Sequence, residues 1–354
     1  MMKNRVFGMV AFFCMLVGCL CVAQQPDEKI DWEAAQLVHP GVRFVKFQWE
    51  TPRATPLSAE QVEKVHKEMI EKKRSQETID NYKADVRPMK IYVMRIDLTM
   101  KGLTFTGTGR AEGWGEKMPD HAKQIIRTRR LRTAQFMKDC RKPKEEGGRG
   151  LDMIVANNSA PWSPWESPYT HKFGNPSALN ISDGVIITDN PGGHKAILVV
   201  YKNGKIDIVD HIDTAQYEAE GRTKYDDIWF AHSGFGIILK NGETTPQTTS
   251  GYDRPLMPRM TCGLDKDRHY MYLVAVDGRM FGWSEGATGT DLVRIMRAAG
   301  AYDVIDFDGG GSATLCYWDD EKKAPQTVNR HDRVPNGYYR PCGMNMGIYI
   351  KHDN

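Results

Sequence analysis

Short runs in which apolar and polar residues alternate recur along most of the chain, and this period of two predicts a fold built mainly from β-strands. Three of these runs contain or lead to a dipeptide that is typical of hairpin turns. They are residues 181–188 around Asp183-Gly184, residues 196–209 around Asn203-Gly204, and residues 228–239 leading to Asn241-Gly242. Because a hairpin joins antiparallel strands, most of the predicted sheet is antiparallel.

Two segments instead have the spacing of an amphipathic helix. Ser58 and Gln61 form a capping box before an apolar stripe in a highly charged segment. Thr288 and Asp291 cap a second helix, which we expect to end at Gly300. Together with the strands, these helices predict an α+β fold: a mostly antiparallel mixed sheet with packed helices, plus a small N-terminal helical appendage.

The first 23 residues have the pattern of a signal peptide. Lys3 and Arg5 precede an apolar run over residues 6–22, which is too short to favour a membrane span. Cleavage after Ala23 is one expectation, and a lipoprotein box ending at Cys19, which would carry a lipid anchor, is the alternative. We therefore expect an exported protein, either periplasmic or secreted. An N-terminal appendage over residues 24–86 would precede the main domain, residues 87–354.

The overall charge is nearly balanced. The 48 Lys and Arg face 45 Asp and Glu, and without the two cations of the leader the balance is 46 to 45. A general surface for polyanions is therefore not predicted, and no nucleic-acid partner is expected. Arg127, Arg129, Arg130 and Arg132 nevertheless lie close together in sequence, either for phosphate capture or as an ordinary surface cluster.

Four cysteines follow the leader: Cys140, Cys262, Cys316 and Cys342. An oxidising compartment permits disulfides between them. The last three lie in apolar or strand-like surroundings, so buried free thiols are the favoured interpretation. No CxxC pair or Cys/His spacing supports a zinc site.

The densest chemistry lies between Tyr302 and Trp318. In a strand over residues 304–308, Asp306 and Asp308 would share one face, about 6.6 Å apart along the chain. This distance lies between the carboxyl separations of retaining and inverting glycosidases, so the stereochemistry stays open. Gly309, Gly310 and Gly311 follow, and their amides could turn toward an anion. Ser312 adds a hydroxyl, and an apolar segment after it predicts a returning strand.

Polar residues also interrupt or end other predicted strands. Asn157 follows the strand over residues 151–156, and a loop with Trp162 and Trp165 comes next, either as a sugar platform or as a core plug. His232 interrupts a third apolar run and could be structural or a proton donor. Arg259 and Arg279 flank strand ends, where guanidinium groups suit a phosphate better than lysine would.

These motifs resemble the phosphodiester glycosidase family. The resemblance rests on Asp308 to Thr314, DGGGSAT, with the eight residues before it, and runs from about Ile91 to the C-terminus, which makes residues 87–354 a catalytic domain. Further matching segments, in the expected order, are Ala156-Asn157-Asn158, Ser182-Asp183-Gly184, His232-Ser233-Gly234, Pro258-Arg259, Val276-Asp277-Gly278-Arg279, and Asn329 with Arg340. Ala313 departs from the family, in which serine is commoner there.

The resemblance implies hydrolysis of a sugar-1-phosphodiester in a glycan or glycoconjugate, without a committed cofactor. The residues that it implies for catalysis are Asp308, Asp306, Asn157 and His232. Those that it implies for substrate or phosphate binding are Arg259, Asp277, Arg279, Gly309, Gly310, Gly311, Ser312 and Arg340. Two other functions stay open: a non-catalytic glycan-binding protein of the envelope, and a phosphodiesterase with a divalent cation held by Asp306 and Asp308.

Overall fold

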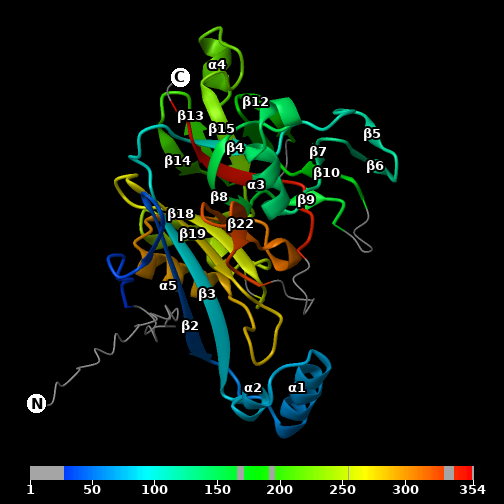
Figure 1. The fold of residues 1–354 in the computed structure, drawn as a ribbon, viewed down its shortest axis with the longest axis vertical. Coiled ribbons are helices and arrows are strands. Elements are labelled where there is room, and N and C mark those ends of the chain that lie inside the picture. Colours follow the sequence, from blue (N-terminus) through cyan, green and yellow to red (C-terminus); the bar gives the residue numbers. More distant parts are fainter. Residues whose placement is uncertain (1–27, 166–170, 191–195, 254, 331–338, 353–354) are drawn as a thin grey trace, which may run out of the picture.

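The computed structural model describes residues 28–165, 171–190, 196–253, 255–330 and 339–352 (Figure 1). The predicted signal peptide and the alternative lipid anchor at Cys19 lie outside these residues. No helix in the described ranges is long and apolar enough to cross a membrane.

The largest sheet has eight strands in the order β1-β2-β3-β19-β18-β20-β16-β17, and every neighbouring pair is antiparallel. We refer to it as the main sheet. Its strands are β1 (Gln36–His39), β2 (Val42–Pro52), β3 (Val86–Asp97), β16 (Gly236–Lys240), β17 (Glu243–Thr244), β18 (Arg259–Leu264), β19 (Tyr270–Val276) and β20 (Asp303–Asp306).

Two five-stranded antiparallel sheets pack with the main sheet. The second sheet has the order β22-β21-β8-β23-β4 and the third the order β12-β11-β15-β13-β14. The second consists of β4 (Leu103–Gly107), β8 (Asp152–Asn158), β21 (Leu315–Asp319), β22 (Ala324–Thr327) and β23 (Asn345–Ile350). The third consists of β11 (Leu179–Ser182), β12 (Val185–Asp189), β13 (Ile197–Tyr201), β14 (Ile206–Val209) and β15 (Ile228–Ser233).

Small sheets and short helices complete the fold. The strands are β5 (Lys117–Met118) with β6 (His121–Ile125), and β7 (Thr128–Arg129), β10 (Phe173–Pro176) and β9 (Trp162–Ser163). The helices are α1 (Ala59–Glu71), α2 (Gln76–Asp80), α3 (Thr133–Arg141), α4 (Ala215–Ala219) and α5 (Gly289–Ala299), with 3-10 turns η1 (Lys144–Glu146), η2 (Pro246–Thr249) and η3 (Gly310–Ser312). The predicted α+β class with a mostly antiparallel sheet is confirmed.

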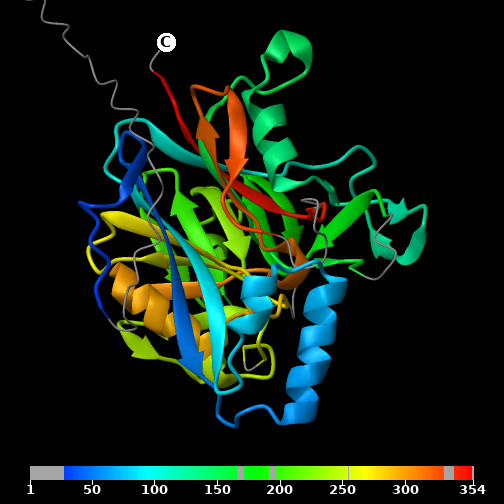
Figure 2. The ribbon, with the colours of Figure 1, turned by 60° about the horizontal axis from the view of Figure 1, so that its bottom comes forward.

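The core lies where the three large sheets meet. Met94 of β3, Val155 of β8 and Phe230 of β15 belong to one buried apolar cluster. The other face of the main sheet is covered by α5, whose Leu292 and Met296 are fully buried (Figure 2). Both predicted capping boxes are present, at Ser58 before α1 and at Thr288 before α5.

In the predicted N-terminal appendage, the described residues 28–86 form strands as well as helices. β2 pairs with β3 along eleven residues, from Val42 to Pro52, so this region supplies two strands of the main sheet. Figure 1 shows α1 and α2 beyond the ends of β2 and β3. Val65, Met69 and Ile79 of these helices pack with Phe281.

The first two predicted hairpins are confirmed as β11–β12 and β13–β14. The third run behaves differently, because β15 belongs to the third sheet whereas β16 belongs to the main sheet. The chain crosses between them at Gly234, where a Cβ atom would lie 2.5 Å from the carbonyl oxygen of Asp306. Asn241-Gly242 instead turns the short β16–β17 hairpin.

A second crossover follows β20. The returning strand after the glycines is β21, and it pairs with β8 of the second sheet. β20 ends at Asp306, two residues earlier than the alternation predicts. The four cysteines after the leader are buried and free, which confirms the favoured interpretation for Cys262, Cys316 and Cys342 and extends it to Cys140.

Candidate functional site

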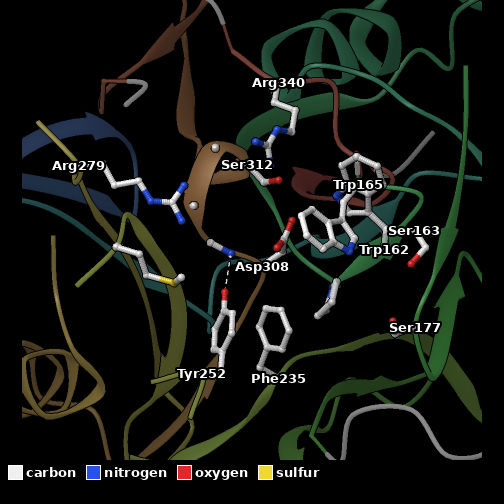
Figure 3. Close-up of a pocket in the computed structure, with 15 residues that line it drawn as sticks. Trp162, Ser163, Trp165, Ser177, Phe235, Tyr252, Arg279, Asp308, Ser312 and Arg340 are labelled. Carbon is white, nitrogen blue, oxygen red and sulfur yellow. Dashed lines mark hydrogen bonds between the residues drawn. The ribbon is translucent and has the colours of Figure 1, made fainter. Parts of the chain in front are cut away.

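A pocket of about 480 Å³ opens where the crossover after β20 meets the loop between β8 and β9. Its lining comes from segments that are far apart in sequence (Figure 3). The lining residues are Pro161, Trp162, Ser163, Trp165, Ser177, Phe235, Tyr252, Met257, Arg279, Asp308, Gly309, Gly310, Gly311, Ser312 and Arg340.

Asp308 is placed by a change of sheet. The amide of Phe307 still bonds the carbonyl of Met260 in the main sheet, but the amide of Asp308 bonds the carbonyl of Ser159 after β8, at 2.8 Å. The side chain of Asn158 donates to the carbonyl of Asp308 at 2.6 Å. The end of β8 and the residue after it therefore hold both the amide and the carbonyl of Asp308. The carboxylate points into the pocket (Figure 3).

Burial changes the acidity of this carboxyl group. It raises the pKa of Asp308 to about 6, since a charged group is disfavoured where water is excluded. The Ser312 hydroxyl, the Arg340 guanidinium and the Trp162 indole oppose this rise. Near neutral pH, Asp308 is thus mostly a carboxylate, but it takes up a proton more readily than an ordinary aspartate does.

Two of the three glycines do not turn their amides toward the pocket as predicted. The amide of Gly309 donates to the hydroxyl of Tyr252 at 3.2 Å, and that of Gly310 to the carbonyl of Pro258 at 2.8 Å. These two N–H groups are therefore occupied by the protein itself.

The glycines instead make room for two arginines. A Cβ atom on Gly310 would lie 3.3 Å from Nη1 of Arg279, and one on Gly311 would lie 2.4 Å from Nη2 of Arg340. Gly310 also has a φ of +59°, a region that residues with side chains rarely adopt. Figure 3 shows the two guanidinium groups approaching the loop from different sides. The pocket thus presents two planar cations above the loop, next to Asp308.

Aromatic rings form much of the remaining wall. Trp162 is buried and carries the guanidinium of Arg130 at 4.5 Å from its ring centre, whereas Trp165 is 60% exposed. Phe235 and Tyr252 stack with ring centres 3.5 Å apart. The pocket therefore combines one tryptophan fixed in the wall with another that is open to solvent.

Arg259 does not reach this pocket. It is fully buried, and its guanidinium donates to three carbonyl groups, those of Tyr252, Pro255 and Ala287, each at 3.0 Å. It also lies 3.3 Å from the carboxylates of both Asp253 and Asp306. Arg259 is therefore not placed where the expected phosphate contact needs it, because this side chain anchors the loop that carries Tyr252 and does not line the pocket.

Asp306 belongs to the same buried cluster. The expected shared face with Asp308 is not formed as one strand, because the chain changes sheets between the two residues. Burial raises the pKa of Asp306, and Arg259 opposes that rise. Asp306 does not line the pocket.

Three further residues named from the sequence also lie behind the pocket wall. His232 is buried, its Nδ1 lies 2.9 Å from Oγ of Ser159, and burial lowers its pKa to about 3. Asn157 is buried and donates to the carbonyl of Asn158 at 2.7 Å.

Asp277 is buried as well and has a structural set of partners. It accepts from the hydroxyl of Tyr92 at 2.9 Å, the indole of Trp283 at 3.2 Å and the amide of Arg330 at 2.7 Å. Burial raises its pKa to about 6 against these hydrogen bonds. It holds neighbouring segments together and does not line the pocket.

Sequence reasoning missed several lining residues, chiefly Phe235, Tyr252 and Met257. Tyr252 lies in a Gly- and Pro-containing segment, like the tryptophans of the β8–β9 loop, and that composition was an available signal. Among the described residues, no group of three or more His, Cys, Asp or Glu side chains could hold a metal ion.

Comparisons with known proteins find similar folds and one family. A zebrafish structure, described as the N-acetylglucosamine-1-phosphodiester alpha-N-acetylglucosaminidase catalytic domain auto-inhibited by its pro-peptide, aligns with 90% of this chain and 87% of its own. The TM-score is 0.53 and the identity 15%, a likeness of fold. A hypothetical protein from Synechocystis aligns over 75% of this chain and 60% of its own, at a TM-score of 0.44 and 12% identity.

A search of curated proteins finds no match. The model of the phosphodiester glycosidase family, however, matches residues 165–341, which is half of the 354-residue chain and contains most of the pocket lining. The chain belongs to the phosphodiester glycosidase family.

Proposed function

We propose that this protein is an exported hydrolase that cleaves the bond between the anomeric carbon of a sugar and a phosphodiester. The observation that carries the proposal is the meeting of one carboxylate, Asp308, with the guanidinium groups of Arg279 and Arg340 in one pocket. The family of the chain supports the same reaction class.

The two arginines would bind the phosphate. A guanidinium fork can donate two parallel hydrogen bonds to phosphate oxygens, and it keeps its charge at all working pH values. As the bond to the anomeric carbon lengthens, negative charge grows on the departing phosphate. Arg279 and Arg340 would stabilise that charge more strongly than the ground state, which is the requirement for catalysis.

Asp308 would serve the sugar side of the same bond. The anomeric centre becomes cationic in the transition state, and a nearby carboxylate stabilises it or activates the attacking group. Asp308 is the one carboxylate among the described residues that line the pocket. A phosphate leaves more readily than a sugar alcohol, so the reaction needs little help from a second carboxyl group acting as an acid.

The tryptophans give the sugar a surface. An indole ring packs against the apolar face of a pyranose, and Trp165 is 60% exposed at the pocket. Ser163 and Ser177 line the same pocket and offer hydroxyl groups to a sugar. The proposed substrate is therefore a glycan or glycoconjugate that contains a sugar-1-phosphodiester.

Export is part of the proposal and rests on the leader alone. Lys3, Arg5 and the apolar run over residues 6–22 precede a small residue at Ala23. Mass spectrometry of the N-terminus from the native host tests it: a chain that begins at Gln24 or Cys19 is expected, and an intact Met1 would contradict export.

The decisive experiment measures turnover of a panel of sugar-1-phosphodiesters by the mature chain and by its Asp308→Asn variant. Asn has nearly the same shape, so we expect an unchanged melting temperature and a rate loss of about a hundredfold or more. Undiminished turnover by a folded Asp308→Asn variant would refute the role of Asp308. Binding without turnover by the wild type would favour the glycan-binding alternative, and loss of turnover with a chelator would favour the cation-assisted one.

A further inference from the structure

Arg110 and Arg127 both lie over the ring of Trp114, outside the pocket. Their guanidinium carbons are 3.7 Å and 4.7 Å from its ring centre. The tryptophan is fixed, because its indole N–H donates to the carbonyl of Ile187 at 3.0 Å. Arg110 is fixed too, since its Nε donates to the carbonyl of Ile186 at 2.9 Å. We call Arg110, Trp114 and Arg127 the arginine–tryptophan cluster.

The two positive charges have no negative partner in the described chain. No carboxylate among the described residues lies within ion-pair distance of either guanidinium, whereas Arg43 pairs with Glu33 and Arg149 pairs with Asp183. Burial and then the charge of Arg110 lower the pKa of Arg127. Two like charges held together at a surface are unfavourable unless an anion offsets them.

The cluster is connected to the pocket through three short strands. Arg127 donates its amide to the carbonyl of Gly174 in β10, and β10 pairs Pro176 with the pocket residue Trp162 in β9. Two strand spacings amount to about 10 Å. Arg130, on the ring of Trp162, lies on the same segment as Arg127. Figure 1 shows the β5–β6 hairpin of this segment beside β7 and β10.

The surrounding segment is basic although the chain is not. Residues 109–132 contain seven Lys or Arg and three Asp or Glu, whereas the whole chain has 48 and 45. A local excess of this kind attracts anions over short distances, within about 8–10 Å at physiological ionic strength. Of the four arginines between residues 127 and 132, Arg130 supports the pocket wall and Arg127 belongs to the arginine–tryptophan cluster.

We propose that Arg110, Trp114 and Arg127 form a second anion-binding subsite, which holds another phosphodiester group of the same substrate chain. This inference rests on the proposed function and deepens it, because it names the substrate class: a glycan whose sugar units are linked repeatedly through phosphodiesters. A guanidinium fork fits a phosphodiester, and the Trp114 ring holds the two guanidinium groups close together. A monomeric sugar-1-phosphodiester would fill the pocket and leave this subsite empty.

The test compares two variants with equal loss of charge. One is Arg110→Gln/Arg127→Gln, and the control is Lys64→Gln/Lys67→Gln on the exposed face of α1. The probes are a short linear polyphosphate and inorganic phosphate, with affinity measured by calorimetry at several salt concentrations. We expect polyphosphate affinity to fall about tenfold in the arginine variant, with its salt dependence reduced by about one to two phosphate contacts. Inorganic phosphate affinity and the control variant should be unchanged.

Equal polyphosphate affinity in the wild type and the arginine variant would overturn the proposal, as would an equal loss in the lysine control. Polyphosphate and inorganic phosphate are not substrates of the proposed hydrolysis, so a failure of that function leaves this comparison intact. Once a substrate is known, kcat/KM should fall for a phosphodiester-linked oligomer in the arginine variant and stay constant for the monomer. A parallel loss on both would also contradict a remote subsite.

Discussion

Asp308 and Arg259 show how the surroundings of a residue decide what its charge can do. Asp308 is partly buried at a pocket wall, so its carboxylate faces the pocket while burial raises its pKa to about 6. Arg259 has the charge expected of a phosphate ligand, but three carbonyl groups and two carboxylates surround it. Charge alone therefore does not identify the binding residues in this family member.

The acidity of Asp308 predicts a pH profile. The proposed reaction needs the carboxylate, and the folded pKa of about 6 lies above the usual value of 3.8. We expect kcat/KM to fall as the pH drops through about 6, approaching tenfold per pH unit below it. Initial rates between pH 4 and pH 9, each with a melting curve, measure this. A rate that rises as the pH falls through 6 would mean that the protonated acid is the active form.

Arg279 and Arg259 should respond differently to the same substitution. Arg279→Lys keeps the charge but loses the fork, so we expect kcat/KM to fall by about tenfold, or about 1.4 kcal/mol, with stability unchanged. Arg259→Lys cannot reproduce the buried contacts, and we expect a loss of about 2–4 kcal/mol in the free energy of unfolding. Steady-state kinetics and denaturant melts of both variants separate the two roles. Wild-type kinetics for Arg279→Lys would assign the phosphate to Arg340.

At the scale of elements, the site lies where two crossovers between sheets meet, at Gly234 and after β20. Local patterns predicted two of the three hairpins, both capping boxes and the glycine loop, because each depends on residues close in sequence. They could not predict that the chain would change sheets after Phe307, since alternation continues past the last paired residue. The pairing of Arg259 with Asp253 and Asp306 depends equally on distant segments.

The glycine loop makes a prediction of its own. In Gly311→Ala the new methyl group would lie 2.4 Å from Nη2 of Arg340, and a side-chain end can move aside without disturbing the backbone. We therefore expect a KM raised by about tenfold, equal to about 1.4 kcal/mol of binding, with little change in melting temperature. Gly109→Ala is the control, because a Cβ atom on Gly109 would have nothing within 4 Å. An unaltered KM in the first variant would show that Arg340 does not bind substrate through this contact.

At the scale of the whole molecule, residues 28–86 contain two parts that contribute differently to stability. β2 runs beside β3 and buries Phe47 and Trp49 in the core. The intervening helices α1 and α2 leave and rejoin the sheet at neighbouring points, because the amide of Arg53 bonds the carbonyl of Asp85 at 2.7 Å. The helical part is thus an insertion between two strands of the main sheet.

Replacement of residues 54–84 by a short Gly-Ser linker should therefore leave a folded protein. We expect pocket activity to persist and the melting temperature to fall by a few degrees, since the contacts of Met69 and Ile79 with Phe281 are lost. Trp49→Ala in β2 should instead cost about 3–5 kcal/mol. Thermal melts and turnover compare the two variants. If the linker variant did not fold and Trp49→Ala kept the wild-type melting temperature, the helices and not β2 would be the part that the fold requires.

The four buried thiols are a built-in set of reporters of local opening. Burial raises the pKa of Cys140 to about 11 and those of Cys316 and Cys342 to about 12, and it raises that of Cys262 still further, so none is reactive while covered. Cys262 lies in the main sheet, Cys316 in the second sheet and Cys140 on α3. An alkylating reagent labels a buried thiol only after its surroundings open. The order of labelling, measured by peptide mass, would therefore show which part of the protein opens first.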